Sequence, residues 1–196
     1  MKITAAVVIA MAAAMSGQAA DELQRTVTVY VADEHGASRQ VTFAKDQATK
    51  MFAQIGIRIQ WRSVGRSLPS DAVIVELVER ASPNECAGAL ACAKPFEGVH
   101  IRVFYDRVCA TVPDRMVSPL LAHVLVHEIT HILQGVSRHS DSGIMKAQWD
   151  VHDFETMARK PLQFCPEDVS LIERGFDARQ SRFVTARASL PAPAAL

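Results

Sequence analysis

Two histidines spaced four residues apart, with a glutamate beside the first, form the stretch of this sequence best suited to chemistry. They are His127, Glu128 and His131, in the pattern HExxH. Residues four apart lie on one face of an α-helix, so both imidazoles can reach one metal ion. Zinc held in this way lowers the pKa of a bound water, and the adjacent carboxylate can accept its proton. The pattern predicts a Zn²⁺ site with Glu128 as general base for hydrolysis.

A zinc site of this kind needs a third protein ligand and an open fourth position. His123 shares the helical stripe, but it lies eight residues from His131, about 12 Å along a helix axis, so one ion cannot easily take both. We expect His123 to be a core residue or one that supports the ligands, and a place facing the substrate is the alternative.

His139 is the favoured third ligand, because imidazole completes a common set of three histidines. It follows Gly135, which can end the helix and let the chain double back. Asp141 on the same loop and Glu155 on a later helix are the alternatives.

The segment HEITHILQGVSRHSDSGIM, from His127 to Met145, resembles the metzincin zinc peptidases, and the matrixin-like members most. Their pattern is HExxHxxGxxH, followed by a tight turn that carries a methionine beneath the metal. In this resemblance Gly135 corresponds to the glycine, His139 to the third ligand and Met145 to the turn methionine. The resemblance implies a zinc-dependent endopeptidase of bacterial type that acts on peptides or proteins.

The sequence departs from that pattern between the second and third ligands. Gly135 comes one residue late and His139 two residues late, and Ser137 occupies the usual ligand position. No tyrosine follows Met145, so the tyrosine metal ligand of some metzincins is absent. The ligand loop is therefore longer than in the family pattern.

The elements that must position these residues are visible in the periodicity of apolar side chains. Strands are expected at 25–31, 57–62, 72–78 and 98–105, with a loop before the last of them, and helices at 45–55, 117–133, 151–159 and 166–174. This order predicts an α/β (α+β) fold, a mixed twisted sheet packed on the active-site helix with C-terminal helices.

The strand at 98–105 (GVHIRVFY) has two interpretations. As an edge strand it would pair with an extended peptide substrate and place Tyr105 near the cleft. As an internal strand it would use Tyr105 for packing.

The first residues are typical of a secretory signal peptide. Lys2 precedes a short apolar run, and small residues lead to cleavage after Ala19 or Ala20. The expected organisation is a signal peptide at 1–20, a metallopeptidase domain at 21–185 and a flexible tail at 186–196, in a secreted or periplasmic protein.

Four cysteines lie in the part that would be exported: Cys86, Cys92, Cys109 and Cys165. An even count in an oxidising compartment predicts two disulfides, for which three pairings exist. We favour Cys86 with Cys92, which bracket a short loop of small residues, and the other two then pair by elimination.

Composition excludes several classes of protein. Lys plus Arg and Asp plus Glu are both 21, so the net charge is zero, which argues against nucleic-acid binding. No apolar run reaches the length of a transmembrane helix. We expect a monomer. Two further hypotheses are a non-catalytic exported binding protein on a zinc-peptidase fold and a zinc hydrolase that uses Glu155.

Overall fold

The computed structural model of the chain describes residues 25–33, 38–69, 72–80, 82, 84–93 and 100–188. The predicted signal peptide and most of the predicted tail, from 189 onward, lie outside the described residues.

A five-stranded mixed sheet forms one layer of the fold. Its order is β2-β1-β3-β5-β4. The strands are β1 (Thr26–Asp33), β2 (Arg58–Ser63), β3 (Val73–Val78), β4 (Ala91–Ala93) and β5 (His100–Phe104). The first four strands of this order run parallel, and β4 pairs antiparallel with β5 at the edge. The predicted mixed sheet is confirmed.

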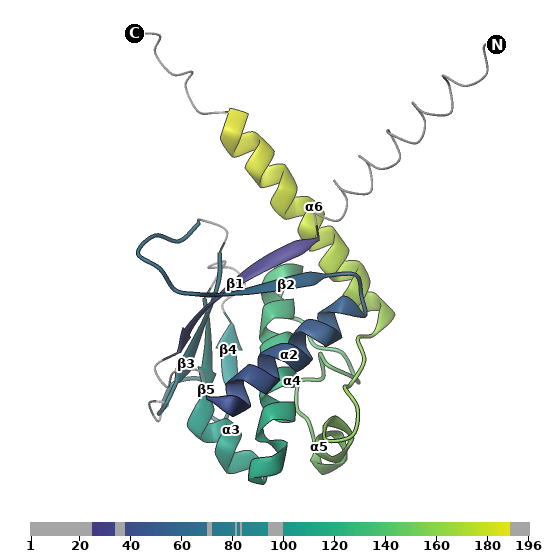
Figure 1. Cartoon of the computed structure of the whole chain (residues 1–196). Helices are drawn as coiled ribbons and strands as arrows, with labels where there is room; N and C mark the ends of the chain where they lie inside the picture. Colours follow the sequence, from purple (N-terminus) through teal and green to yellow (C-terminus); the bar gives the residue numbers. More distant parts are fainter. Residues whose placement is uncertain are drawn as a thin grey trace, which may run out of the picture.

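Helices form the second layer, and Figure 1 shows α2 and α4 on the same side of the sheet. The helices are α2 (Arg39–Ala53), α3 (Tyr105–Thr111), α4 (Asp114–Gln134), α5 (Val151–Met157) and α6 (Pro166–Ala188). The central helix α4 contacts α2, α5 and α6 as well as the sheet. It is therefore the element around which the rest is arranged.

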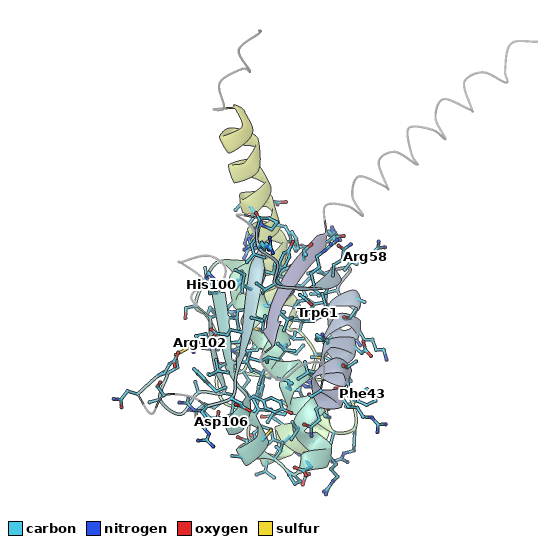
Figure 2. All side chains as sticks on the ribbon, turned by 60° about the vertical axis from the view of Figure 1, so that its left-hand side comes forward. Phe43, Arg58, Trp61, His100, Arg102 and Asp106 are labelled. Carbon is cyan, nitrogen blue, oxygen red and sulfur yellow. A yellow bond between two sulfur atoms is a disulfide. The ribbon has the colours of Figure 1, made fainter. Side chains whose placement is uncertain are left out.

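The core lies between the sheet and these helices. Alternate residues of β1 are fully or nearly buried, namely Val27, Val29 and Val31, as the period of two in a strand requires. Figure 2 looks onto the other face, with His100 and Arg102 of β5 on one side and Arg58 of β2 on the other.

Helix α4 is buried without a break from Leu120 to Gln134. It is long and apolar enough to cross a membrane by length and composition, but most of its apolar stretch is buried inside the fold. Its position is that of a core helix.

A close contact fixes α6 against the end of α4. A Cβ atom added at Gly175 would lie 1.8 Å from the carbonyl oxygen of Leu133. Only glycine permits this approach, so α6 can pack directly on the helix that carries the two predicted histidine ligands.

Several elements differ from the expected ones. Helix α2 begins at Arg39 rather than 45, because the Ser38 Oγ accepts a hydrogen bond from the Val41 N–H and caps it. Helix α3 follows β5 directly, and α6 continues to Ala188, into the predicted tail. Strand β4 lies in the predicted loop. Its three residues are too few to show a period.

The strand β5 is internal, because β3 and β4 pair with its two sides. The interpretation of 98–105 as an edge strand is therefore wrong. Tyr105 begins α3, and its hydroxyl donates a hydrogen bond to the side-chain oxygen of Gln40.

The favoured disulfide, Cys86–Cys92, is confirmed. The second predicted pair is wrong, because Cys109 and Cys165 are free thiols. Cys109 lies on α3, before the start of α4, whereas Cys165 precedes α6, which packs on the end of α4. The two thiols have different neighbours: the Cys165 Sγ donates to the Ser142 carbonyl at 3.5 Å, whereas the Cys109 thiol is hydrogen-bonded to Tyr105.

Candidate metal centre

The end of α4 turns the chain back toward the HExxH residues. Gly135 caps the helix in the left-handed conformation, with φ 68°, and its N–H donates to the His131 carbonyl at 3.0 Å. Glycine adopts this conformation without strain. The loop that follows brings His139 back beside the helix, as the sequence predicts.

Three histidines meet at this point. Their ligand nitrogens all lie within 4.8 Å of one another, in the cluster His127, His131 and His139. The ring centroids are 4.7 Å apart for the two helical histidines, and His139 lies 5.3 Å from His127 and 5.0 Å from His131. The two helical histidines are buried, whereas His139 is exposed at the mouth of the site.

The hydrogen bonds of the two helical histidines fix their tautomers. His127 Nδ1 lies 2.9 Å from the Ile144 carbonyl, and His131 Nδ1 lies 3.2 Å from the Val136 carbonyl. A carbonyl can only accept, so each Nδ1 carries a proton and donates it. In a neutral ring the other nitrogen, Nε2, is then a bare lone pair.

The two Nε2 atoms lie only 3.1 Å apart. When both rings are neutral, neither Nε2 has a proton to donate to the other. The two Nε2 atoms therefore direct their lone pairs toward the same point. Burial lowers the pKa of His127 to about 4 and also lowers that of His131, which keeps both rings neutral near pH 7.

This donor set fits a zinc ion. Two nitrogens bound to one tetrahedral zinc at about 2.1 Å lie roughly 3.4 Å apart, close to the separation of the helical pair. Each Nδ1 already has the carbonyl partner that zinc-binding histidines use to fix their orientation. His139 can supply the third nitrogen.

A tight turn after His139 contacts the first of the helical histidines. Gly143 has φ +77°, and the next residue, Ile144, carries the carbonyl that accepts from His127. The Ile144 N–H donates to the Gln163 carbonyl at 3.1 Å, and the Ser140 N–H donates to the Met145 carbonyl at 2.8 Å. Met145 itself is completely buried.

Glu128 is buried next to the cluster but does not belong to it. Burial raises the pKa of its carboxyl to about 7, against a smaller opposing effect of a hydrogen bond from the Ala93 backbone. A carboxylate with such a pKa can both accept and return a proton near neutral pH.

The histidines and Glu128 open into a cleft of about 540 Å³. The cleft is lined by the edge strand β4 with the residues before it, from Gly88 to Ala93, and by the segment from Lys146 to Trp149. The Trp149 ring lies edge-on 5.4 Å from His127, and its Nε1 donates to the Gly143 carbonyl at 3.3 Å. The site is therefore reached through a partly apolar groove.

The other candidate ligands lie outside the cluster. His123 is buried, its Nδ1 donates to the Pro119 carbonyl at 2.7 Å, and its Nε2 accepts from the Leu162 N–H at 3.0 Å. Both ring nitrogens are thus used for structure. Asp141 and Glu155 are exposed and do not belong to the cluster of three histidines.

Sequence reasoning missed the residue that ties the ligand loop to α6. Asp168 is completely buried and accepts from the Ser140 Oγ at 2.6 Å and the Cys165 N–H at 3.1 Å, while an Arg138 nitrogen lies 3.3 Å away. Pro166 and an acid two residues later are typical of a helix start, which could have placed Asp168 in the first turn. Its partner Ser140 depends on the tertiary fold.

Comparisons with known proteins support the fold and leave the family open. No family model matches the sequence, and no curated protein matches it, so the likeness to matrixins has no support from sequence comparison. Among solved structures, archaemetzincin from Methanopyrus kandleri superposes with a TM-score of 0.56 at 15% identity, covering 78% of this chain and 95% of that one. The chain therefore has a fold similar to that of archaemetzincin.

Proposed function

We propose that this chain is a zinc-dependent endopeptidase in which His127, His131 and His139 hold Zn²⁺ and Glu128 is the general base. The observation that carries the proposal is that the Nε2 atoms of His127 and His131 lie 3.1 Å apart and both carry a lone pair. In each ring a backbone carbonyl accepts from Nδ1 and so leaves Nε2 unprotonated. The fold similar to archaemetzincin supports it.

A zinc ion bound by the three imidazoles supplies a Lewis acid that polarises a carbonyl and acidifies a water. Glu128 takes the proton of the attacking water and then passes it to the leaving amine. Its burial serves the first of these steps, since a carboxylate with a raised pKa is a stronger base and accepts the proton of water more readily than an exposed one.

The edge strand β4 offers a peptide substrate a place to bind. The Phe104 N–H donates to the Leu90 carbonyl, so by the alternation of an antiparallel pair the backbone groups of Ala91 point away from β5, toward the side on which no described strand pairs with β4. An extended peptide would add to this edge by main-chain hydrogen bonds. We propose that the monomer binds peptides or proteins in this way.

Export is part of the proposal. The signal-like residues 1–20 favour it, and so does the Cys86–Cys92 disulfide, since such bonds persist mainly in oxidising compartments.

The test compares the wild type with E128Q and E155Q, each assayed for bound zinc and for cleavage of a peptide library. E128Q is expected to keep zinc and lose hydrolysis, because Glu128 is not a ligand. E155Q, which alters an exposed carboxylate, is expected to keep both.

Hydrolysis retained in E128Q would refute the mechanism. Zinc lost in E155Q would favour the hydrolase that takes Glu155 as ligand. A wild type that binds zinc but cleaves no peptide would favour the non-catalytic binding protein.

A further inference from the structure

We propose that Arg107 is the positioning residue of the substrate edge, holding the segment before β4 in the shape that sets this strand along the cleft. The inference rests on the proposed function, because it assigns β4 to substrate binding. Arg107 lies on α3, outside the histidine cluster and the lining of the cleft.

The guanidinium of Arg107 donates hydrogen bonds to four backbone carbonyls of the segment that precedes β4. Nη1 donates to the carbonyls of Cys86 at 2.9 Å and Ala89 at 2.7 Å, and Nη2 to those of Glu85 at 3.0 Å and Ser82 at 3.3 Å. Four acceptors on one side chain greatly exceed what an incidental surface contact provides.

The segment is folded so that these carbonyls converge. Cys86 has φ 42° and Gly88 has φ 77°, and the Ala89 N–H donates to the Cys86 carbonyl at 2.9 Å. The disulfide to Cys92 closes the same turn. Convergent carbonyl oxygens repel one another unless a cation lies between them, and the guanidinium supplies that charge.

The arginine is itself held on a rigid part of the fold. Its guanidinium carbon lies 4.3 Å from the centre of the Phe104 ring, at the end of β5, and its backbone N–H donates to the Asp106 carboxylate at 2.8 Å. Figure 2 shows Asp106 at the lower end of the sheet, beyond Arg102 of β5. Arg107 therefore links the loop to the strand that pairs with β4.

The segment held by Arg107 continues directly into the cleft wall. Ala89, which accepts from Arg107, lines the cleft together with Ala91 and Ala93, and the backbone of Ala93 bonds to Glu128. A shift of the loop would move the outer edge of β4 relative to Glu128, the proposed general base.

The test replaces Arg107 by lysine, which keeps the charge but cannot span four carbonyls with its compact ammonium group. R107Q is measured beside it, so that the conclusion does not depend on one variant. The control is R159K, since Arg159 is exposed and pairs with Glu155 one turn earlier.

The first readout is hydrogen–deuterium exchange of the backbone amides at 89–93. Both Arg107 variants are expected to exchange about tenfold faster there, with the HExxH segment of α4 unchanged, because opening is local to the loop. Wild-type exchange rates in both variants would overturn the proposal.

The second readout is kinetic and uses zinc-loaded enzyme. For a peptide long enough to lie along β4, KM is expected to rise about five- to tenfold with kcat nearly unchanged, the pattern of lost uniform binding. A variant that only lowers thermal stability, or lowers kcat at constant KM, would overturn the positioning role. If the wild type cleaves no peptide, the proposed function fails, and the exchange comparison alone decides on Arg107.

Discussion

Gly143 is the residue on which the turn beside the candidate metal site depends, and G143A tests this dependence. A Cβ at this position would lie 2.3 Å from the Gln163 carbonyl oxygen, which already accepts the N–H of Ile144. The backbone also has φ +77°, a conformation that costs a residue with a side chain about 1–2 kcal/mol. Moving the Gly143 turn away from Gln163 adds roughly 1–2 kcal/mol for the lost hydrogen bond and packing.

The expected loss is therefore about 2–4 kcal/mol, or roughly 6–12 °C in the melting temperature of a domain of this size. The matched control is G88A, because Gly88 has the same φ of +77° but no atom within 4 Å of an added Cβ. It carries the conformational cost alone, about 1–2 kcal/mol.

Urea denaturation of the metal-free variants gives both free energies of unfolding, and a zinc titration follows the ligands. G143A is expected to be less stable than G88A and to bind zinc more weakly, since Ile144 orients His127. Equal stability of the two variants would show that the turn can move away from Gln163 at no cost, and would refute the reasoning.

Three further changes test other parts of the fold. Burial lowers the pKa of His123 to about 4 from an ordinary 6.5. The neutral ring therefore contributes fully to folding stability above pH 6.5, and this contribution is lost as the pH falls toward 4. Between pH 6.5 and 4 the free energy of unfolding of the metal-free wild type should thus fall by up to about 3 kcal/mol more than that of H123Q, measured by denaturation. The same pH dependence of stability in both proteins would contradict this prediction. D168N should destabilise by about 1–3 kcal/mol and weaken zinc binding, whereas E167Q, on the exposed partner of Arg138, should change stability by less than about 0.5 kcal/mol. G175A should lower stability by about 3 kcal/mol in thermal denaturation, despite the better helix propensity of alanine. The control G65A, where nothing lies within 4 Å of an added Cβ, should leave stability nearly unchanged. A stabilised G175A would contradict the observed contact between the helices.

The predictable part of the site is the part encoded by short-range geometry. The spacing of His127 and His131 determines their common face on any helix, and Gly135 marks where that helix ends. From there only a loop of a few residues separates His139 from the cluster. The periodicity of the strands likewise predicted the mixed sheet.

The parts that could not be predicted depend on tertiary partners. Strand β4 has three residues and owes its conformation to β5, so no period reveals it. The pairing of Cys109 with Cys165 followed from elimination, which carries no information about distance. Asp168 looks like an ordinary helix-capping acid until the fold brings Ser140 to it.

The measurement that tests the zinc site most directly is the metal content of the purified wild type and of H139A, with D141A as control. Asp141 is exposed on the same loop and lies outside the histidine cluster. We expect about one zinc per chain in the wild type and in D141A, and loss of zinc in H139A. Zinc bound by H139A as tightly as by the wild type would contradict the three-histidine site.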